Sequence, residues 1–499
     1  MLSVILKSKL FPIQCANEII FRLLPLFYEV SRGDGFENQL INTFSAFAIN
    51  THKKYINLNM KKNIILVLLL ITGGLRAQNP ICPIGTYIAD PTARVWADGK
   101  MYIYGSTDDG IGHWCSYKHD VLHSANMKKW DMQLNVFSTK GEKDEVKETD
   151  ALLFAPDALF RNNQYYMYFC TPDRNYSEGV ATSKSPLGPF TNAKKLNIGK
   201  YEEIDPTIFV DDDGQAYYYW GQFTLKGAKM KSNMTELEES TITDNLINNK
   251  EHFFHEGSFV FKRKGIYYAF YAHEGRRDRR PTCLGYSTAT SPLGPFTYRG
   301  IIIDNFGCDP ESWNNHGSIA EFKGQWYVFY HRSSHGVQMM RRACVEPIFF
   351  NADGSIDEVE MTSQGAGKPL DAMIKIEAER ACFLSGYCRI ELIEPGNEAL
   401  RSIWNGDLAA YKYIDFGKGV STFKIRAHSY NGGIINVRIG GSTGKIIATL
   451  NVPPLSARSK FDELSCSVAP VKGGQALWLE FKGVEDGTKL FDIDCFWFE

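Results

Sequence analysis

One strand pattern recurs along the chain, and this repeat constrains the fold more than any other feature of the sequence. Each copy opens with a two-residue turn signal and continues into alternating aromatic and aliphatic residues, as a strand does after a tight turn. The five copies are "DGKMYIYGS", "NNQYYMYFC", "DGQAYYYWG", "KGIYYAFYA" and "KGQWYVFYH". Their central tyrosines, separated by 64, 52, 50 and 59 residues, are Tyr102, Tyr166, Tyr218, Tyr268 and Tyr327.

A second repeat supports the first. The segment "SPLGPF" occurs at 185–190 and again at 291–296. Units of 50 to 60 residues built from short strands, without a convincing amphipathic helix, predict the blades of an all-β propeller. Five units predict five blades. A β-sandwich or a β-helix is the alternative, but a sandwich does not repeat its strands at this period.

A polar residue precedes each central tyrosine by a similar number of positions. In a propeller, the strand before this hairpin is the innermost, so equivalent positions in successive blades form a ring around the central channel. We therefore expect these side chains to face one another. They are Asp90, Asp157, Asp205, Glu256 and His316, which lie 12, 9, 13, 12 and 11 residues before their tyrosines.

Carboxylates crowded around one axis are costly, because like charges repel and raise each other's pKa. Single Asp-Pro pairs usually cap turns, but Asp90, Asp205 and Glu256 in register favour a functional role. We expect Asp157 to be structural, because its offset is shorter, and Glu274 to be a loop residue, because it follows its strand. Two carboxylates facing a sugar are the usual equipment of glycoside hydrolysis, and a third near the acid helps it to keep its proton.

The segment from about Gly85 to Leu370 resembles glycoside hydrolase family 43, whose members are five-bladed β-propellers. The resemblance is carried, in this order, by "ADPTARVWADGKMYIYGS", "FAPDALFRNNQYYMYF", "EIDPTIFVDDDGQAYYYWG", "FHEGSFVFKRKGIYYAFYA" and "NNHGSIAEFKGQWYVFYHR". It implies that Asp90 is the general base, Glu256 the general acid, and Asp205 the residue that tunes and orients the acid. It also implies inversion of the anomeric configuration, without a catalytic cofactor.

The same resemblance suggests further site residues. His316 matches a family histidine near the axis, often beside a bound calcium ion or water. Arg341 falls where the family has an arginine that reaches substrate hydroxyls, and the adjacent Arg342 competes for that role. Trp114 and Phe154 are candidates for the substrate-binding pocket wall, with ordinary core packing as the alternative.

The segment "GAGKPLDA" predicts a linker over 365–373. It would separate a propeller catalytic domain over 80–364 from a second domain over 374–499, which is long enough for one β-sandwich of the jelly-roll type. The second domain resembles carbohydrate-binding module family 6, through its opening "EAE" and closing "DID" strands.

This second resemblance implies a structural calcium ion held by Glu377, Glu379 and Asp494. Oxygen ligands suit calcium, although ordinary surface carboxylates are the alternative interpretation. The family's sugar site usually has a tyrosine and a tryptophan that sandwich a ring. Tyr387 and Trp404 are the candidates for that pair, but the loop "SARSKFDELS" contains no tryptophan, which leaves sugar binding by this domain open.

The segment 60–77, "MKKNIILVLLLITGGLRA", has the features of a secretory signal peptide cleaved after Ala77. Its apolar run is too short to span a bilayer as a helix. Signal peptides begin a chain, so we expect Met60 to be the true start and 1–59 to be a non-native upstream extension, with a genuine N-terminal extension as the alternative. A secreted or periplasmic protein follows, and 11 cysteines fit that location.

The net charge of −2 argues against nucleic acid or an anionic membrane as a partner. The expected partner is a plant cell-wall polysaccharide or oligosaccharide. We expect a glycosidase that releases L-arabinofuranose or D-xylose from arabinoxylan, arabinan or xylan. The alternatives are an endo-acting arabinanase or xylanase, and a non-catalytic carbohydrate-binding propeller, which would not need all three carboxylates.

Overall fold

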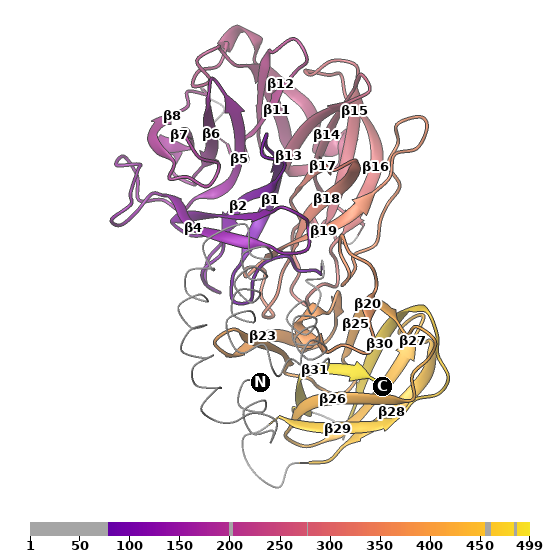
Figure 1. Ribbon diagram of the computed structural model, residues 1–499. Coiled ribbons are helices and arrows are strands. Elements are labelled where there is room, and N and C mark those ends of the chain that lie inside the picture. The colour runs from indigo at the N-terminus through magenta and orange to yellow at the C-terminus, as the bar shows by residue number, and fades with distance from the viewer. Residues whose placement is uncertain (1–77, 199–202, 277, 455–460, 484–486) are drawn as a thin grey trace, which may run out of the picture. The chain divides into compact units, whose positions relative to one another are not determined.

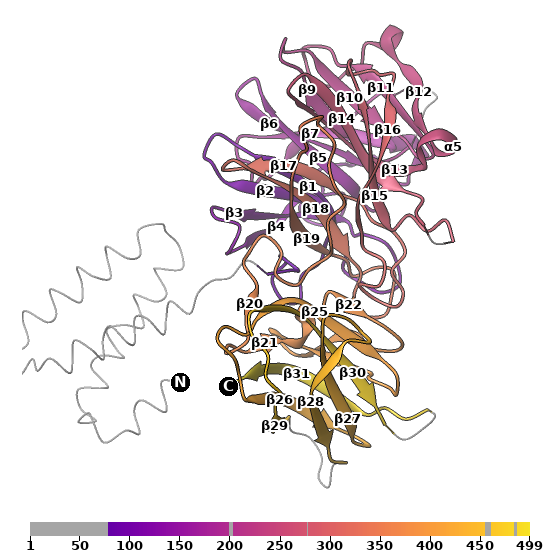
Figure 2. The same ribbon diagram turned by 90° about the vertical axis from the view of Figure 1, so that its right-hand side faces the viewer.

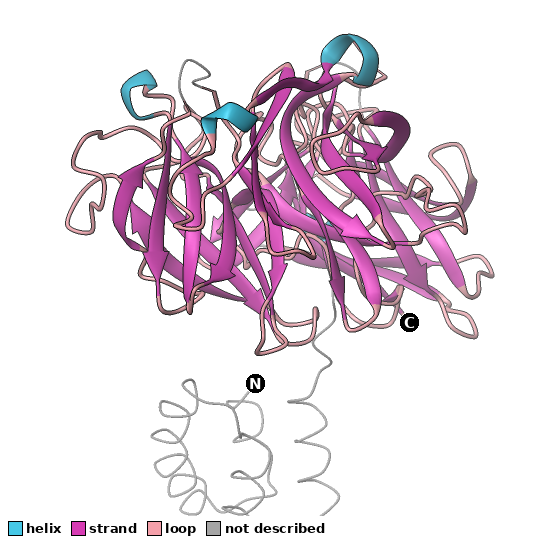
Figure 3. Ribbon diagram, turned by 90° about the horizontal axis from the view of Figure 1, so that it is seen from above, coloured by secondary structure: helices cyan, strands magenta, loops and turns pink. Residues whose placement is uncertain are grey.

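The computed structural model describes residues 78–198, 203–276, 278–454, 461–483 and 487–499. Both the predicted signal peptide, 60–77, and the predicted upstream extension, 1–59, lie outside these residues. Strands and loops make up nearly all of the described chain (Figures 1 and 3). The all-β prediction is therefore confirmed.

Five antiparallel sheets follow one another along the first part of the chain, and four of them have four strands while the last has three. In chain order the strands are β1 (Ile88–Val95), β2 (Met101–Thr107), β3 (Lys118–Ser124), β4 (Asp131–Ser138); β5 (Phe154–Arg161), β6 (Gln164–Cys170), β7 (Glu178–Ser183), β8 (Thr191–Lys195); β9 (Thr207–Val210), β10 (Ala216–Trp220), β11 (Thr224–Lys229), β12 (Thr243–Asn248); β13 (Phe254–Arg263), β14 (Ile266–His273), β15 (Cys283–Ala289), β16 (Thr297–Asp304); β17 (Ser318–Phe322), β18 (Gln325–Arg332) and β19 (Arg342–Ile348).

The five repeated segments of the sequence form the second strand of each sheet, namely β2, β6, β10, β14 and β18. The first strands β1, β5, β9, β13 and β17 contact one another in a closed ring, so they line the centre of a five-bladed propeller. The ring closes where Ile103 of the first sheet packs with Phe329 and Val345 of the fifth. At the same junction, the Ser318 hydroxyl accepts a hydrogen bond from the Ala93 N–H at 2.8 Å.

Aromatic side chains of the repeat fill the spaces between neighbouring blades. Tyr104 and Phe169, from the first and second sheets, belong to one buried cluster. Tyr168 and Tyr218, from the second and third sheets, lie with ring centroids 5.5 Å apart. Each large side chain removed from water contributes about 1.5–3 kcal/mol, so the alternation in the sequence supplies the adhesion between blades.

The C-terminal part forms two six-stranded sheets, with strand order β20-β25-β30-β27-β28, where β22 also pairs with β25, and β23-β24-β31-β26-β29, where β21 also pairs with β31 (Figure 2). The strands are β20 (Leu370–Asp371), β21 (Ile376–Glu377), β22 (Phe383–Leu384), β23 (Arg389–Glu394), β24 (Asn397–Arg401), β25 (Leu408–Asp415), β26 (Thr422–Ser429), β27 (Gly433–Ile439), β28 (Lys445–Val452), β29 (Asp462–Ser467), β30 (Gly474–Lys482) and β31 (Phe491–Phe498). Their inner faces share one apolar core, which confirms the predicted sandwich. Within the predicted linker, 365–373, β20 already pairs in parallel with β25.

Helices in the described residues are single turns: the 3-10 helices η1 (Arg174–Tyr176), η2 (Glu239–Thr241) and η3 (Ala378–Arg380), and the α-helix α5 (Asn249–His252). None of the helices in this part of the chain is long and apolar enough to cross a membrane. The ten cysteines of the described ranges are all free thiols, and nine of them are buried. Packing and hydrogen bonds, not disulfides, therefore hold these ranges together.

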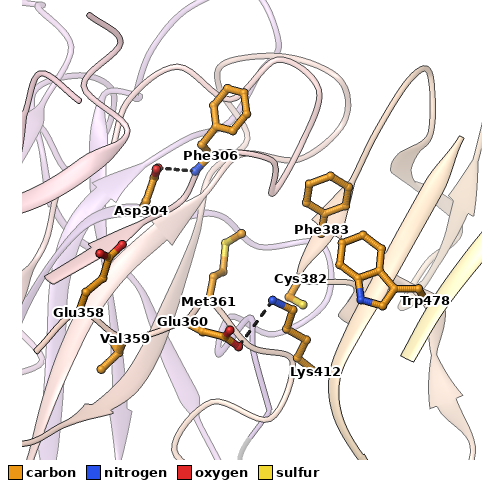
Figure 4. Close-up of a pocket in the computed structure, with 10 residues that line it drawn as sticks. All are labelled: Asp304, Phe306, Glu358, Val359, Glu360, Met361, Cys382, Phe383, Lys412 and Trp478. Carbon is orange, nitrogen blue, oxygen red and sulfur yellow. Dashed lines mark hydrogen bonds and ion pairs between the residues drawn. The ribbon is translucent and has the colours of Figure 1, made fainter. Parts of the chain in front are cut away.

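A cavity of about 340 Å³ is lined by residues of both the propeller and the sandwich (Figure 4). Its aromatic side chains include Phe383 and Trp478, whose ring centroids lie 5.0 Å apart. Two of its three acidic side chains have basic partners, since Glu360 lies 3.6 Å from Lys412 and Glu358 accepts a hydrogen bond from Arg276, while Asp304 accepts one from the Phe306 N–H. This cavity shares no residue with the predicted carboxylate ring.

Candidate active site

The predicted ring residues come together at the start of the innermost strands. Asp90 lies in β1 and Glu256 in β13, while Asp205 and His316 stand two residues before β9 and β17. Asp90, Asp205 and His316 are each about 5% exposed. Asp205 interacts electrostatically with both Glu256 and Asp90, and Glu256 also interacts with His316. The ring is formed by tertiary structure, because these residues are 50 or more positions apart in the chain.

Asp90 is surrounded by one arginine, two histidine rings and a serine hydroxyl. Its Oδ1 accepts a hydrogen bond from Arg341 Nη1 at 2.9 Å and lies 3.4 Å from His331 Nδ1 and 3.6 Å from His316 Nδ1. The Ser106 hydroxyl donates to Oδ2 at 2.5 Å. Burial alone would raise the pKa of Asp90, but Arg341 and the two histidines outweigh it and hold that pKa well below its usual range. Asp90 is therefore ionised at any working pH.

Asp205 has the opposite surroundings. Burial, followed by the nearby carboxyls of Glu256, Asp90 and Glu178, raises the pKa of Asp205 well above its usual range. Since both members of the close pair Asp205 and Glu256 cannot easily be ionised together, the pair retains one proton. The channel thus holds one permanent carboxylate beside a proton-carrying pair.

The backbone at both aspartates is strained in the same way. Asp90 and Asp205 have φ values of 51° and 63° although each precedes a proline, and this left-handed region costs a non-glycine residue about 1–3 kcal/mol. Each N–H donates to a side chain at the end of the second strand of the preceding blade. The Asp90 N–H donates to His331 Nδ1 at 3.2 Å, and the Asp205 N–H donates to Cys170 Sγ at 3.3 Å.

Irregularities in strand pairing orient the side chains of Asp90 and Glu256. The register of β1 with β2 shifts between Ala89 and Thr92, around Asp90, and the register of β13 with β14 shifts on both sides of Glu256. Such bulges bend a strand and redirect a side chain, and they are common beside active sites. Next to Glu256, Gly257 has a φ of 62°, and a Cβ atom there would lie 2.8 Å from the His316 ring.

Glu256 has a polar environment of its own. The Gln222 side-chain amide donates to Glu256 Oε2 at 2.8 Å, and His255 Nε2 lies 3.8 Å from the same oxygen. His255 is in turn held by Glu274, 3.3 Å away. Glu274 therefore supports the site through His255, although it is a loop residue, as expected from the sequence.

Of the two adjacent arginines, Arg341 belongs to the ring. Its guanidinium donates twice to the buried Asp108 at 2.9 Å, once to Asp90, and stacks over the Trp114 ring at 4.7 Å from the centroid. Arg342 instead forms a buried bidentate pair with Glu398 of the sandwich. Trp114 thus covers the arginine that contacts Asp90, while its place in a substrate pocket stays a prediction.

Phe154 and Asp157 belong to the second blade. Phe154 is half-buried and pairs with Cys170, whose sulfur contacts Asp205, so it lies beside the ring. Asp157 is fully buried and accepts bonds from Arg94, at 3.0 and 2.5 Å, and from the Thr207 hydroxyl at 2.9 Å. Its hydrogen-bonding capacity is used between blades, as expected for a structural residue.

Several residues of the site were not predicted from the sequence. Ser106, His331, Gln222 and His255 lie against the side chains of Asp90 or Glu256. Asp108 holds Arg341, and the Cys170 sulfur accepts a hydrogen bond from the Asp205 N–H. His331 and Cys170 end the fifth and second copies of the repeated strand, so the last position of each copy was the available signal. Glu178, which begins β7 and has a short hydrogen bond with Tyr218, carries no signal in the sequence.

The predicted calcium ligands of the sandwich give a mixed result. Both carboxyl oxygens of the buried Glu379 lack a hydrogen-bond partner, and burial raises the pKa of Glu379 to about 7. Burial and Asp494 raise the pKa of Glu377. Asp494, however, is already bonded to Asn397 and Arg426, at 2.9 and 2.8 Å. Within the described ranges no group of three or more His, Cys, Asp or Glu residues is arranged to hold a metal ion. The calcium site stays a prediction.

The candidate sugar clamp of the sandwich is closed. The rings of Tyr387 and Trp404 lie 4.7 Å apart between centroids, tilted by 36°. A sugar between two rings would need two van der Waals layers of about 3.5–4.0 Å each. The two side chains therefore pack on each other and do not sandwich a ligand in this structure.

Comparison with known proteins decides the family. The model of glycosyl hydrolases family 43 matches residues 77–356, more than half of the chain. The chain belongs to glycosyl hydrolase family 43. A carbohydrate binding module of family 6 matches residues 377–499. Both predicted resemblances are confirmed, and so is the prediction of a glycoside hydrolase.

Relatives of this family 43 chain match either most of it or about half of it. An arabinoxylan arabinofuranohydrolase of Bacillus subtilis is 29% identical over 476 residues, which cover 82% of this chain and 90% of that protein. A xylosidase/arabinosidase of Bacteroides ovatus is 30% identical over 326 residues, covering 55% and 96%. A family 43 enzyme of Xanthomonas citri, solved with xylose, aligns with a TM-score of 0.50 and 27% identity over 58% of this chain and 95% of that one.

Proposed function

We propose that this family 43 hydrolase removes single L-arabinofuranosyl or D-xylosyl residues from arabinoxylan, arabinan or xylan, with inversion at the anomeric carbon. The observation that carries the proposal is the pairing of an always-ionised Asp90 with a proton-retaining Asp205 and Glu256 pair in one channel. An inverting glycosidase needs these two states at once. The names of the relatives in Bacillus subtilis and Bacteroides ovatus support the choice of sugar.

Asp90 is proposed to act as the general base. Arg341, His331 and His316 keep it ionised, so it can accept a proton from a water molecule on one face of the sugar. As the water oxygen forms its bond to the anomeric carbon, its proton passes to Asp90. Arg341 is fixed by Asp108, so it can hold Asp90 in place while a second face of the guanidinium stays stacked on Trp114.

Glu256 is proposed to act as the general acid. The bond between the anomeric carbon and the leaving oxygen breaks while the proton of Glu256 moves to that oxygen. Asp205 tunes this step, because repulsion between the two carboxyls makes the pair retain the proton until substrate arrives. The product sugar then has the opposite anomeric configuration. Asp90 releases to solvent the proton that it took from water, and the pair of Asp205 and Glu256 takes up a proton from solvent.

A substrate panel tests the proposal. Purified protein is incubated with 4-nitrophenyl α-L-arabinofuranoside, 4-nitrophenyl β-D-xyloside, arabinoxylan, linear arabinan and xylan, with Asp90→Ala as the control. We expect release of a monosaccharide, with inverted configuration in the first-formed product by NMR. Release of oligosaccharides alone would make the enzyme endo-acting, while binding without hydrolysis would make it a carbohydrate-binding propeller. Retention of configuration would overturn the assignment of Asp90 as a base.

We also propose export through the signal peptide 60–77. This segment and residues 1–59 precede the described chain, and the propeller core is complete without them. A chain that begins at Gln78 should therefore be as active as the full chain. N-terminal sequencing of protein from the native secretory host should find Gln78 first. Failure of the shortened chain to fold would contradict this interpretation.

A further inference from the structure

The turn between β10 and β11 places Gln222 against the proposed acid. We propose that Gln222 is a positioning residue, which holds Glu256 so that Oε1, and not Oε2, presents the proton to the leaving oxygen. This inference rests on the proposed function, in which Glu256 is the acid. It extends that function by assigning a task to a residue that touches neither water nor the scissile bond in the mechanism above.

The contact itself indicates which oxygen is free. Gln222 Nε2 donates to Glu256 Oε2 at 2.8 Å. A side-chain NH₂ group can only donate, so Oε2 acts as the acceptor in this bond. A proton carried by Glu256 therefore belongs on Oε1. The bond also limits rotation of the carboxyl, and fixed geometry is a large part of what proton transfer requires.

The backbone of the turn is built to place Gln222. Gly221 has a φ of 131°, and a Cβ atom there would lie 2.2 Å from the Thr224 carbonyl oxygen and 2.7 Å from Glu203 Oε2. The Gln222 N–H donates to that same Glu203 oxygen at 2.9 Å. The buried Lys226 donates to the other Glu203 oxygen at 2.7 Å. A glycine, a carboxylate and a lysine thus fix one peptide group.

The next residue ties the turn to the strand that bears the acid. The Phe223 N–H donates to the carbonyl oxygen of His255, the neighbour of Glu256, at 2.6 Å. Its carbonyl oxygen accepts from the Asn249 N–H at 3.1 Å. Phe223 has a φ of 61°, which is strained for a bulky side chain. Strain of this kind is retained mainly where function benefits from the resulting geometry.

The charges around Glu256 explain why a neutral donor is useful there. Asp205 from the third blade repels an ionised Glu256. The ring of His255 from the same strand also faces Glu256 and in turn faces Glu274, while His316 of the fifth blade interacts with Glu256, although burial lowers the pKa of His316. The Gln222 amide adds a hydrogen bond to the ionised form without adding charge. It therefore eases release of the proton that Asp205 helps to retain.

The test compares substrates that need an acid with substrates that do not. For Gln222→Leu and the isosteric Gln222→Glu, we expect kcat on xylo- or arabino-oligosaccharides to fall about 10- to 100-fold, within the range general acid catalysis supplies. KM should change little. On a 2,4-dinitrophenyl glycoside, whose leaving group departs without protonation, the loss should stay within about 3-fold. The alkaline limb of the Gln222→Leu rate profile should move to higher pH, because the acid releases its proton less readily.

Gln215→Leu is the matched control. Gln215 lies in the same blade and its side chain donates to the carbonyl oxygens of Ala216 and Met230, away from the ring. We expect wild-type kinetics from it. Equal losses for Gln222→Leu on both kinds of substrate, or an alkaline limb that does not move, would contradict the positioning role. Gln222 would then only connect two blades of the propeller. If Glu256→Ala itself discriminates between the two substrates and Gln222→Leu does not, this inference alone fails. If neither discriminates, the proposed function fails with it.

Discussion

Asp90 and Asp205 occupy equivalent positions in the first and third blades. Both precede proline, both have left-handed backbones, and both have their N–H groups held by the end of a second strand. Their titration nevertheless differs in direction, because Arg341, whose sequence distance from Asp90 is 251 residues, faces one of them and Glu256 faces the other.

The difference teaches that local sequence places a carboxyl, whereas its neighbours decide its chemistry. Burial raises the pKa of both aspartates, so burial cannot account for the contrast. Positive partners reverse its effect at Asp90, and negative partners reinforce it at Asp205. Substitutions at the two positions should therefore differ in kind as well as in size.

Removing the carboxylate that is always ionised should have the largest effect. Asp90→Asn should lower kcat by about 10³-fold or more on every glycoside, activated or not, because all of them need an activated water. The pKa of Asp90 is depressed by folding, so its charge stabilises the folded state above the unfolded pKa and is lost in acid. The variant should also melt at a lower temperature at pH 7. Near-normal activity by direct assay of released sugar would contradict the base assignment.

Removing the proposed acid should slow hydrolysis of natural glycosides much more than hydrolysis of activated ones. Glu256→Ala should lose about 10²- to 10⁴-fold on natural glycosides but much less on 2,4-dinitrophenyl glycosides, whose leaving group needs no proton. Azide should partly rescue one of the two variants, Asp90→Asn or Glu256→Ala, by standing in for the missing carboxylate. Parallel kinetics on both substrate classes provide the measurement. A Glu256→Ala enzyme equally slow on both would exclude it as the acid.

Neutralising the second aspartate should have a smaller effect on rate and an opposite effect on stability. Folding raises the pKa of Asp205, so its contribution to stability is present below the unfolded pKa and is lost as pH rises through the folded pKa. Asp205→Asn should therefore be roughly a few degrees more stable than wild type at pH 7 to 8 by calorimetry. Activity should fall about 10-fold or more, with its alkaline limb moved to lower pH, because Glu256 loses the repulsion that retains its proton. A lower melting temperature would show that Asp205 is held as a charge.

The smallest effect concerns a third buried carboxyl, Glu379 of the sandwich. If calcium binds Glu379 with Glu377 and Asp494, excess chelator should lower the melting temperature of the whole protein, since the ion would bind only the folded form. Glu379→Gln should abolish this response, and activity on small glycosides should not change. An unaltered melting curve in chelator would leave Glu379 as a buried carboxyl without a metal ion, whose pKa burial raises.

Much of the fold and part of the site follow from local patterns in the sequence. Alternation with period two marks a strand wherever it occurs, and its fivefold repetition predicts five blades. Asp90, Asp205, Glu256 and His316 are predicted to share one ring because they stand 11 to 13 residues before the central tyrosines of their blades. The sandwich is predicted from the length of 374–499 and from its resemblance to carbohydrate-binding module family 6, which the opening "EAE" and closing "DID" strands carry.

The remaining features depend on contacts between blades, which no local pattern records. Arg341 and Arg342 are adjacent in the sequence, yet Arg341, just before β19, bonds to Asp90, whereas Arg342, the first residue of β19, bonds to Glu398 of the sandwich. The closed pair of Tyr387 and Trp404 is likewise a matter of packing. The protonation state of each aspartate also depends on such contacts. Coulomb interactions act through space, so the charge on each aspartate is set by residues that the folded propeller, not the chain order, brings near it.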